Sequence, residues 1–481
     1  IYFSFIPMSV IAFILGTIIP ASIGWLTIRM FERNTPVLKN TERWILGTVM
    51  GTTLTMYLFF LGESIGIMKF SVMNMLLLSI IFLAVLLWFW LRMREYWKGD
   101  SPDLAKSSSI KSLPTWIKIL LSALAVLTIV KIVTATILLV GSPAYLDDVY
   151  KNWNMRGKVF YVTQEMHLNS ESVSSSVIDT GVYSYPPSVP LTKTWLASLA
   201  GGWNEGLVNS PHILWYLIAL ALVFFFLRRH VNLLWSLAGV YGLSSLPLFL
   251  IHGASAYADI FVAIHVFAAV SMLYNAIKAK ESDIRLSYLR LGTLFAALLI
   301  FTKNEALLLH LPTFIALFIG SLAWMRYQSE LSKKETRLIF FHSIAVISLV
   351  LLPWLIFKWS HGLSFGNAHE VSGLSISWQP RVLYSVYLNT IMEGNWSLLF
   401  PVLLGLLIIK WKSAFLSPLV ILVGYFCILY FGQLLIFMFT SLSVEALKQT
   451  GYARGIIQLA PIAIVIIILL MTSFADNKSD H

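Results

Sequence analysis

The residues best suited to chemistry lie in short polar stretches between long apolar runs. The stretch "AYLDDVYKNWNMRGKVFY" (144–161) places two adjacent acids, Asp147 and Asp148, directly after such a run. Adjacent carboxylates disfavour each other's ionisation, so one of them can be held as a poised base. Much later, Lys303 lies in the turn "TKNE" and Arg454 opens the last apolar run; a lysine point charge and an arginine fork both suit a phosphate. At a membrane surface, these residue types predict transfer of a group from a lipid phosphate to a hydroxyl that the base deprotonates.

Composition places these residues in a membrane protein. Of the 481 residues, 58% are hydrophobic and only 12% are charged, whereas a soluble chain carries about 25% charged residues. Recurring apolar runs of about 20 residues suit helices rather than barrel strands, so we expect an all-α polytopic fold. The net charge of +11 comes mostly from Lys and Arg in short loops, which indicates membrane topology and not a nucleic-acid partner. The single Cys427 excludes an intramolecular disulfide and a multi-cysteine metal site.

The loop charges predict the orientation of the spans, because Lys and Arg are enriched in cytoplasmic loops. They give about thirteen spans, with the N-terminus outside, the C-terminus inside, and two large outer loops at 142–207 and 359–394. The predicted spans are 2–27, 44–66, 71–91, 114–141, 209–227, 231–251, 257–277, 286–302, 306–325, 338–358, 395–411, 414–439 and 455–474. Two of them, 286–302 and 395–411, are near the minimum length for crossing.

This topology gathers acids and cations on the outer side. Besides the first-loop acids and Arg454, the outer residues are Tyr257, Asp259, Lys303, Asn304 and Glu305. Ionisable groups at the membrane boundary are costly and usually face a cavity or each other. Each has a plainer interpretation: the aspartates could cap helices, Lys303 could snorkel to the headgroups, and Arg454 could anchor a phospholipid. Their convergence on one face favours a site.

The first outer loop predicts helices that lie in the interface. Residues 148–161 offer Val149, Trp153 and Phe160 on one side of a helix, with Lys158 elsewhere. Such a helix lies along a membrane surface rather than across it. The segment "YPPSVPLTKTWLASLAGG" (185–202) enters through an extended Pro-Pro pair and continues as a helix too short to span.

These motifs resemble the GT-C superfamily of integral-membrane glycosyltransferases that use polyprenyl-phosphate sugars. The similarity is to the bacterial branch akin to protein O-mannosyltransferases and the aminoarabinose transferase of lipid A. It covers about residues 114–474. The matching stretches are "DDVYKNWNMRGKVFY" with Asp148, Trp153, Arg156 or Lys158; "YPPSVPL" with Tyr185; "AYADIFVA" with Tyr257 and Asp259; "TKNEALLL" with Lys303, Asn304 and Glu305; and "GYARGIIQLAP" with Arg454.

The resemblance implies an inverting sugar transfer at the outer face of a bacterial cytoplasmic membrane. The first-loop Asp is the implied general base, which by register is Asp148, with Asp147 as an adjacent acid; the Arg and Lys are implied phosphate contacts. The implied partners are a polyprenyl-phosphate-linked sugar, a glycan, lipid or protein acceptor, and membrane lipids. Some members of the family use a divalent metal and others do not; Asp147, Asp148 and Asp259 could hold one through oxygen ligands.

The chain departs from the family pattern in two ways. Three spans, within 1–113, precede the span where the family usually starts, and they form an N-terminal extension to the catalytic module 114–474; residues 475–481 form a cytoplasmic tail. Asp147–Asp148 also stands where the protein-modifying branches often carry Asp-Glu, which leaves the acceptor class open.

Two other functions stay open on the sequence. A transporter or flippase of lipid-linked or charged solutes is the main alternative, and a glycan polymerase or ligase is another. Transporters commonly keep charged groups near the middle of the membrane. Here the charges gather at one surface, which two large loops face, and this arrangement favours an enzyme.

Overall fold

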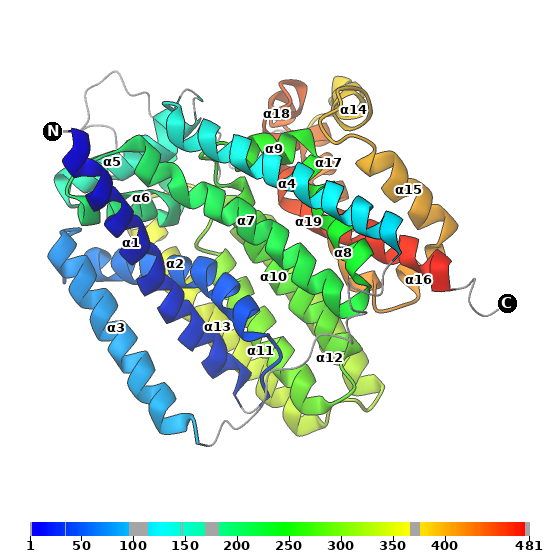
Figure 1. Ribbon diagram of the computed structural model, residues 1–481. Coiled ribbons are helices and arrows are strands. Elements are labelled where there is room, and N and C mark those ends of the chain that lie inside the picture. The colour runs from blue at the N-terminus through cyan, green and yellow to red at the C-terminus, as the bar shows by residue number, and fades with distance from the viewer. Residues whose placement is uncertain are drawn as a thin grey trace.

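A computed structural model describes residues 2–33, 35–95, 114–144, 146, 148–168, 182–365 and 376–476. These residues form helices and connecting loops, with no strand among them, and most of the long helices run roughly side by side (Figure 1). The all-α class expected from the composition is therefore confirmed for the described part of the chain.

The helices follow the predicted apolar segments closely. The long helices are α1 (Tyr2–Glu32), α2 (Asn40–Ser64), α3 (Val72–Met93), α4 (Thr115–Gly141), α7 (Glu205–His230), α10 (Asp259–Lys278), α11 (Ser282–Leu299), α12 (Leu311–Tyr327), α13 (Lys333–Ser360), α17 (Val420–Phe439) and α19 (Gly451–Asp476). The shorter elements are η2 (Val149–Asn154), α5 (Met155–Thr163), η4 (Val182–Ser184), α6 (Ser188–Ala200), α8 (Leu233–Ser245), α9 (Pro247–Gly253), η5 (Ala306–His310), α14 (Arg381–Tyr387), η7 (Leu388–Met392), α15 (Leu399–Ile409), α16 (Trp411–Phe415) and α18 (Ser443–Leu447).

Ten of the described helices are long and apolar enough to cross a membrane. An eleventh span is possible if α8 and α9, which meet at a 76° bend, count as one broken span. With that span counted, the difference from the predicted count of about thirteen lies in the two shortest predicted segments, 286–302 and 395–411. They correspond to α11, which carries Asp283, Arg285 and Arg290 within its length, and to α15, which has only 11 residues. A helix of that length extends about 16 Å, roughly half of a bilayer's hydrocarbon core.

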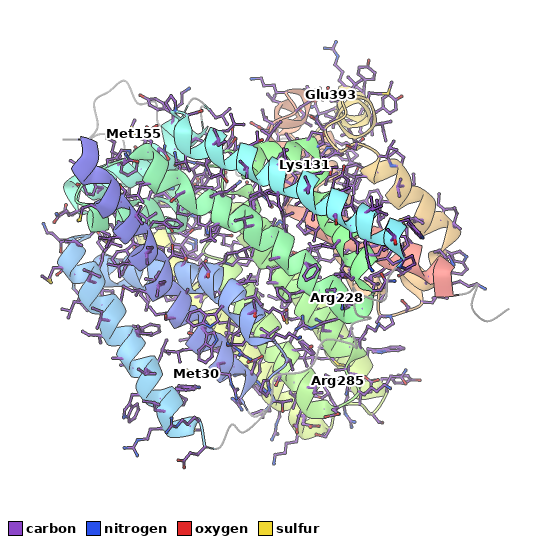
Figure 2. The ribbon with its side chains drawn as sticks, in the orientation of Figure 1. Met30, Lys131, Met155, Arg228, Arg285 and Glu393 are labelled. Atoms are coloured by element: carbon purple, nitrogen blue, oxygen red, sulfur yellow. The ribbon has the colours of Figure 1, made fainter. Side chains whose placement is uncertain are left out.

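Residues that the loop charges assign to opposite sides lie toward opposite ends of the bundle. Figure 2 shows Met155 and Glu393, from the two predicted outer loops, toward one end, and Met30, Arg228 and Arg285 toward the other. The end that carries Met155 and Glu393 is called the Met155 end below. It also carries the short helices α5, α9, α14 and α18 (Figure 1).

The helices differ in how far they are buried, and α10 is the central one. In the most apolar 18-residue stretch of each helix, 94% of the residues of α10 are buried, compared with 11% for α4 and 17% for α3. The outer helices α3 and α4 therefore present apolar side chains outward, as expected for helices that face lipid. A charged residue on α10 is surrounded by protein, so it needs partners from neighbouring helices.

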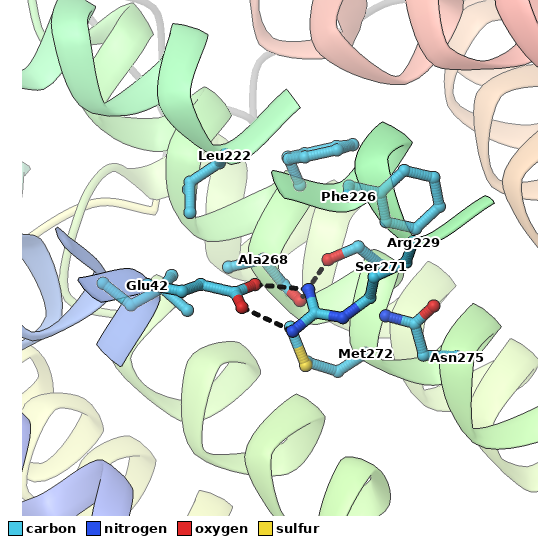
Figure 3. Close-up of a pocket in the computed structure, with 10 residues that line it drawn as sticks. Glu42, Leu222, Phe226, Arg229, Ala268, Ser271, Met272 and Asn275 are labelled. Carbon is cyan, nitrogen blue, oxygen red and sulfur yellow. Dashed lines mark hydrogen bonds and ion pairs between the residues drawn. The ribbon is translucent and has the colours of Figure 1, made fainter. Parts of the chain in front are cut away.

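The first three helices pack into the same bundle as the rest of the described chain. Glu42 of α2 forms a bidentate ion pair with Arg229 at the end of α7 (Figure 3). Thr53 of α2 also hydrogen-bonds to the ring of His265 on α10, with an Oγ1–Nε2 distance of 2.8 Å. The predicted extension 1–113 thus contributes structural contacts to the module that follows it, although residues 96–113 lie outside the described residues.

Helices α1 and α2 meet through glycines spaced four residues apart. A Cβ added at Gly51 would lie 1.8 Å from the carbonyl oxygen of Pro20, and one at Gly24 would lie 2.0 Å from that of Gly47. Small residues at this spacing let the backbones of membrane helices approach closely. We expect Gly51→Ala to push the helices apart and lower the free energy of unfolding by about 1–3 kcal/mol, measured as a lower melting temperature in detergent.

Gly432 provides the matched control, because it also lies inside a long helix but has no atom within 4 Å of an added Cβ. Gly432→Ala should leave stability unchanged or raise it slightly, since alanine is the better helix former. Equal melting temperatures for the two variants would contradict the close-packing interpretation.

Candidate functional site

A buried carboxylate, Asp259, is the centre of the polar cluster at the Met155 end. Asp259 is the first residue of α10, and its side chain is completely buried. Its Oδ1 accepts hydrogen bonds from Lys303 Nζ at 2.9 Å and from Gln458 Nε2 at 3.2 Å, and its Oδ2 accepts one from Arg454 Nε at 3.1 Å. Two cations and an amide thus satisfy a charge that would be very costly if it were buried alone.

Arg454 connects this buried acid to the first outer loop. Its Nη1 donates to Asp148 Oδ2 while its Nε holds Asp259, so one guanidinium bridges two carboxylates. The side chains of Asp148 and Arg454 are 34% and 24% exposed, whereas that of Asp259 is fully buried. The site therefore extends from the buried ion pairs of Asp259 to a partly exposed carboxylate, Asp148.

The two aspartates do not act as helix caps. Asp148 precedes η2 without a side-chain cap hydrogen bond, and the cap of α10 is Ala258 rather than Asp259. Both carboxylates are instead turned toward Arg454. The capping alternative, which the sequence left open for these positions, is therefore not found in the structure.

The "TKNE" turn supplies the other side of the cluster. It connects α11 to η5, and Lys303 Nζ lies 3.3 Å from Glu305 Oε1 in addition to its contact with Asp259. Asn304 Nδ2 donates to Ser184 Oγ at 3.1 Å, which ties the turn to the first outer loop. Lys303 thus contacts α10, Asn304 contacts the first outer loop, and Glu305 contacts Lys303.

Aromatic rings border the cluster on two sides. The ring of Tyr257 lies 5.1 Å from the Arg454 guanidinium carbon and stacks on His252 at 4.6 Å. The ring of Tyr185 lies 5.8 Å from Lys303 Nζ and 5.8 Å from the ring of Trp153. Burial, followed by the negative charge of Glu305, holds the pKa of Tyr185 well above its usual value. Its hydroxyl therefore stays protonated and can donate a hydrogen bond at any physiological pH.

Two π-helical turns shape the site. Asp148 directly precedes η2 and Glu305 directly precedes η5, and both elements then continue as α-helices. A π-turn inserts an extra residue and reorients the side chains before it, and such turns are frequent at functional sites. A π-turn thus directly follows each of the acids that pair with Arg454 and Lys303, Asp148 and Glu305 respectively.

The structure places the remaining predicted residues differently. Arg156 is buried and donates to the carbonyl oxygen of Tyr185 at 3.0 Å, and Trp153 is fully buried beside the same tyrosine. Lys158 is exposed on α5 and belongs to none of the ion pairs between described residues. Asp147 lies outside the described residues, so the predicted acid pair is represented by Asp148 alone.

Four contacting residues lie outside the predicted site: His252, His310, Gln458 and Lys358. His310 Nε2 donates to Gln458 Oε1 at 2.7 Å, and its Nδ1 lies 2.9 Å from the hydroxyl oxygen of Tyr425. His252 Nδ1 lies 3.4 Å from Asp259 Oδ2. The sequence contains a usable sign of Gln458, because this residue follows Arg454 by four positions and must share its helix face. No comparable pattern identified Lys358 or the two histidines as members of the site.

Of the three carboxylates that could hold a metal ion, only Asp148 and Asp259 belong to the described residues. No group of three or more His, Cys, Asp or Glu residues suited to a metal ion occurs among the described residues. Asp148 and Asp259 are separated by the Arg454 guanidinium, which occupies the position between their oxygens. A cation bound jointly by these two carboxylates would have to displace that arginine.

The geometry permits acid–base chemistry at Asp148 and charge stabilisation by the cations behind it. The assignment of Arg454 and Lys303 to a phosphate stays a prediction, since both are engaged by carboxylates in this structure. No known protein family, curated protein or solved structure matches this chain.

Proposed function

We propose that the chain is a membrane glycosyltransferase that moves a sugar from a polyprenyl-phosphate donor to an acceptor at the outer face of a bacterial cytoplasmic membrane. The observation that carries the proposal is the Arg454 bridge, which joins the accessible carboxylate of Asp148 to the buried carboxylate of Asp259. This arrangement holds a partly exposed carboxylate at the Met155 end of a bundle whose outer helices present apolar side chains outward.

In the proposed reaction, Asp148 acts as the general base. It accepts the proton of an acceptor hydroxyl as the hydroxyl oxygen forms a bond to the anomeric carbon. The bond from that carbon to the phosphate oxygen breaks on the opposite side, and the lipid phosphate leaves with the bonding electrons. Configuration at the anomeric carbon is therefore inverted, and a general base of this kind contributes about 10²–10⁴-fold to the rate.

Arg454 has a positioning role in this scheme. Its guanidinium is fixed from behind by Asp259 through Nε, so its Nη1 holds the Asp148 carboxylate in one orientation. Lys303 and Gln458 fix Asp259 in turn through its other oxygen. Preorganised support of this kind keeps a catalytic group in place without reorganisation during the reaction.

The function is tested by incubating the purified protein with a radiolabelled polyprenyl-phosphate sugar. We expect sugar transfer to an added acceptor extract, or slow release to water in its absence, and neither in heat-denatured protein. Movement of the labelled lipid across vesicle membranes without loss of its sugar would favour the alternative of a transporter or flippase. Absence of both turnover and transport would count against the proposal.

A further inference from the structure

Two buried cations next to the candidate site form no ion pair with any acid among the described residues. Arg156 on α5 is 2% exposed and Lys358 near the end of α13 is fully buried. They reach consecutive carbonyl oxygens of the first outer loop: Lys358 Nζ donates to Ser184 at 2.6 Å, and Arg156 Nη2 donates to Tyr185 at 3.0 Å. Residues far apart in the sequence thus bring two positive charges to one short stretch of backbone.

These cations lack a compensating negative charge within the described part of the chain. No described carboxylate lies within 4.0 Å of either one. Arg156 Nε and Nη1 are buried donors without a hydrogen-bond partner, as is the indole Nε1 of the neighbouring Trp153. An unpaired buried ion costs several kcal/mol, and buried charged groups are normally paired, so the arrangement of the described residues suits an anionic ligand.

Charge balance separates this pair from the cluster around Asp259. That cluster holds three carboxylates, those of Asp148, Asp259 and Glu305, against the two cations Arg454 and Lys303. An added anion would meet net negative charge there. Beside Arg156 and Lys358 it would meet two positive charges and unsatisfied donors, so electrostatics favours the second position.

The pair adjoins the "TKNE" turn of the candidate site and is bordered by aromatic rings. Lys358 Nζ lies 3.4 Å from Asn304 Oδ1, and Asn304 adjoins Lys303 in the chain. The rings of Trp354 and Phe365 lie 5.0 Å and 5.1 Å from Lys358 Nζ. Such walls exclude water and strengthen the attraction of a bound anion.

The guanidinium of Arg156 stays charged in this setting. Burial lowers its pKa to about 10, which still leaves it protonated at neutral pH. An arginine fork with free donors and a lysine point charge together match the oxygens of a tetrahedral oxyanion.

We propose that Arg156 and Lys358 form a binding site for a phosphate-type anion. The identity of the ligand rests on the proposed function, under which it is the phosphate of the lipid donor. Arg156 and Lys358 then hold the phosphate, whereas Arg454 and Lys303 hold the carboxylates.

The test measures binding of farnesyl phosphate, a short polyprenyl phosphate without sugar, by the shift in melting temperature of the full chain in detergent. The wild type should be stabilised, whereas Lys358→Met and Arg156→Met should each bind at least about tenfold more weakly. Without ligand, neither variant should melt at a lower temperature than the wild type, because each removes an unpaired buried charge. Lys158→Met, an exposed cation on the same helix as Arg156, is the matched control and should bind as the wild type does.

Further arms identify the source of the anion. Farnesol, which lacks the phosphate, should give no shift. Stabilisation by farnesyl phosphate alone assigns a lipid headgroup, and an equal shift with millimolar inorganic phosphate assigns a free phosphate; both outcomes support the anion site.

The proposal is overturned if the wild type gains nothing from either phosphate, or if both Met variants retain the full shift. A lower melting temperature of Lys358→Met with an intact shift would assign that lysine a purely structural role. Since no sugar is transferred in this assay, intact binding with failed turnover would count against the glycosyltransferase alone.

Discussion

Asp148→Asn is expected to reduce sugar transfer by about 10³-fold while leaving the fold intact. The asparagine keeps the shape of the side chain but cannot accept the proton of an acceptor hydroxyl. The fold should persist because Asp148 is only half-buried and Arg454 keeps its second carboxylate, Asp259. The measurement is the initial rate of transfer from a labelled polyprenyl-phosphate sugar, together with the melting temperature of each purified variant.

Glu165→Gln is the matched control for this loss. Glu165 also belongs to the first outer loop and also pairs with a cation, Lys69, at 2.6 Å, but the pair is exposed and has no contact with the Asp259 cluster. The control removes the same unit of charge and should keep wild-type transfer. Retained transfer in Asp148→Asn, or an equal loss in the control, would refute Asp148 as the base.

The positions of the helices were predictable because they follow from composition and loop charge. Apolar runs of spanning length identify helices, and basic loops order them by side. The bend between α8 and α9 was missed, although its signal was present in the sequence. Pro247 disfavours a helical conformation at the residue before it, and the predicted span 231–251 breaks there.

The site was predictable in its members but not in its pairings. Loop charge placed Asp259, Lys303 and Arg454 at one end of the bundle, and the structure joins all three by ion pairs. Which acid holds which cation depends on how far α10 and α19 are shifted along each other. Sequence patterns do not encode that shift, and they do not encode the π-turns that orient Asp148 and Glu305.

The cations of the first outer loop illustrate the same limit. The resemblance offered Arg156 or Lys158 as the basic residue of the motif, two positions apart on a short helix. The structure separates them, because Arg156 is buried beneath Tyr185 whereas Lys158 is exposed. Lys358 carried no motif at all, and only the folded chain reveals that it shares a backbone stretch with Arg156.

Asp259→Asn is expected to cause the largest loss of stability of any single change at the site. The variant leaves Lys303, whose side chain is 2% exposed, without its principal counter-charge and weakens the hold on Arg454. Breaking a buried ion pair by removing one partner costs about 3–5 kcal/mol. The melting temperature in detergent should therefore fall steeply, and transfer should fall with it because Asp148 loses its fixed support.

Glu305→Gln tests whether burial is the reason. Glu305 contacts the same lysine at 3.3 Å, but its side chain is 28% exposed, so its loss should cost about 1 kcal/mol or less. The double variant Asp259→Asn, Lys303→Met should recover part of the stability, since it removes the stranded charge together with its partner. An equal fall for both single variants, or no recovery in the double variant, would mean that Asp259 stabilises the bundle by some route other than its charge. Asp259 would then not be the group that fixes Arg454, and Asp148 would have to be held by other contacts.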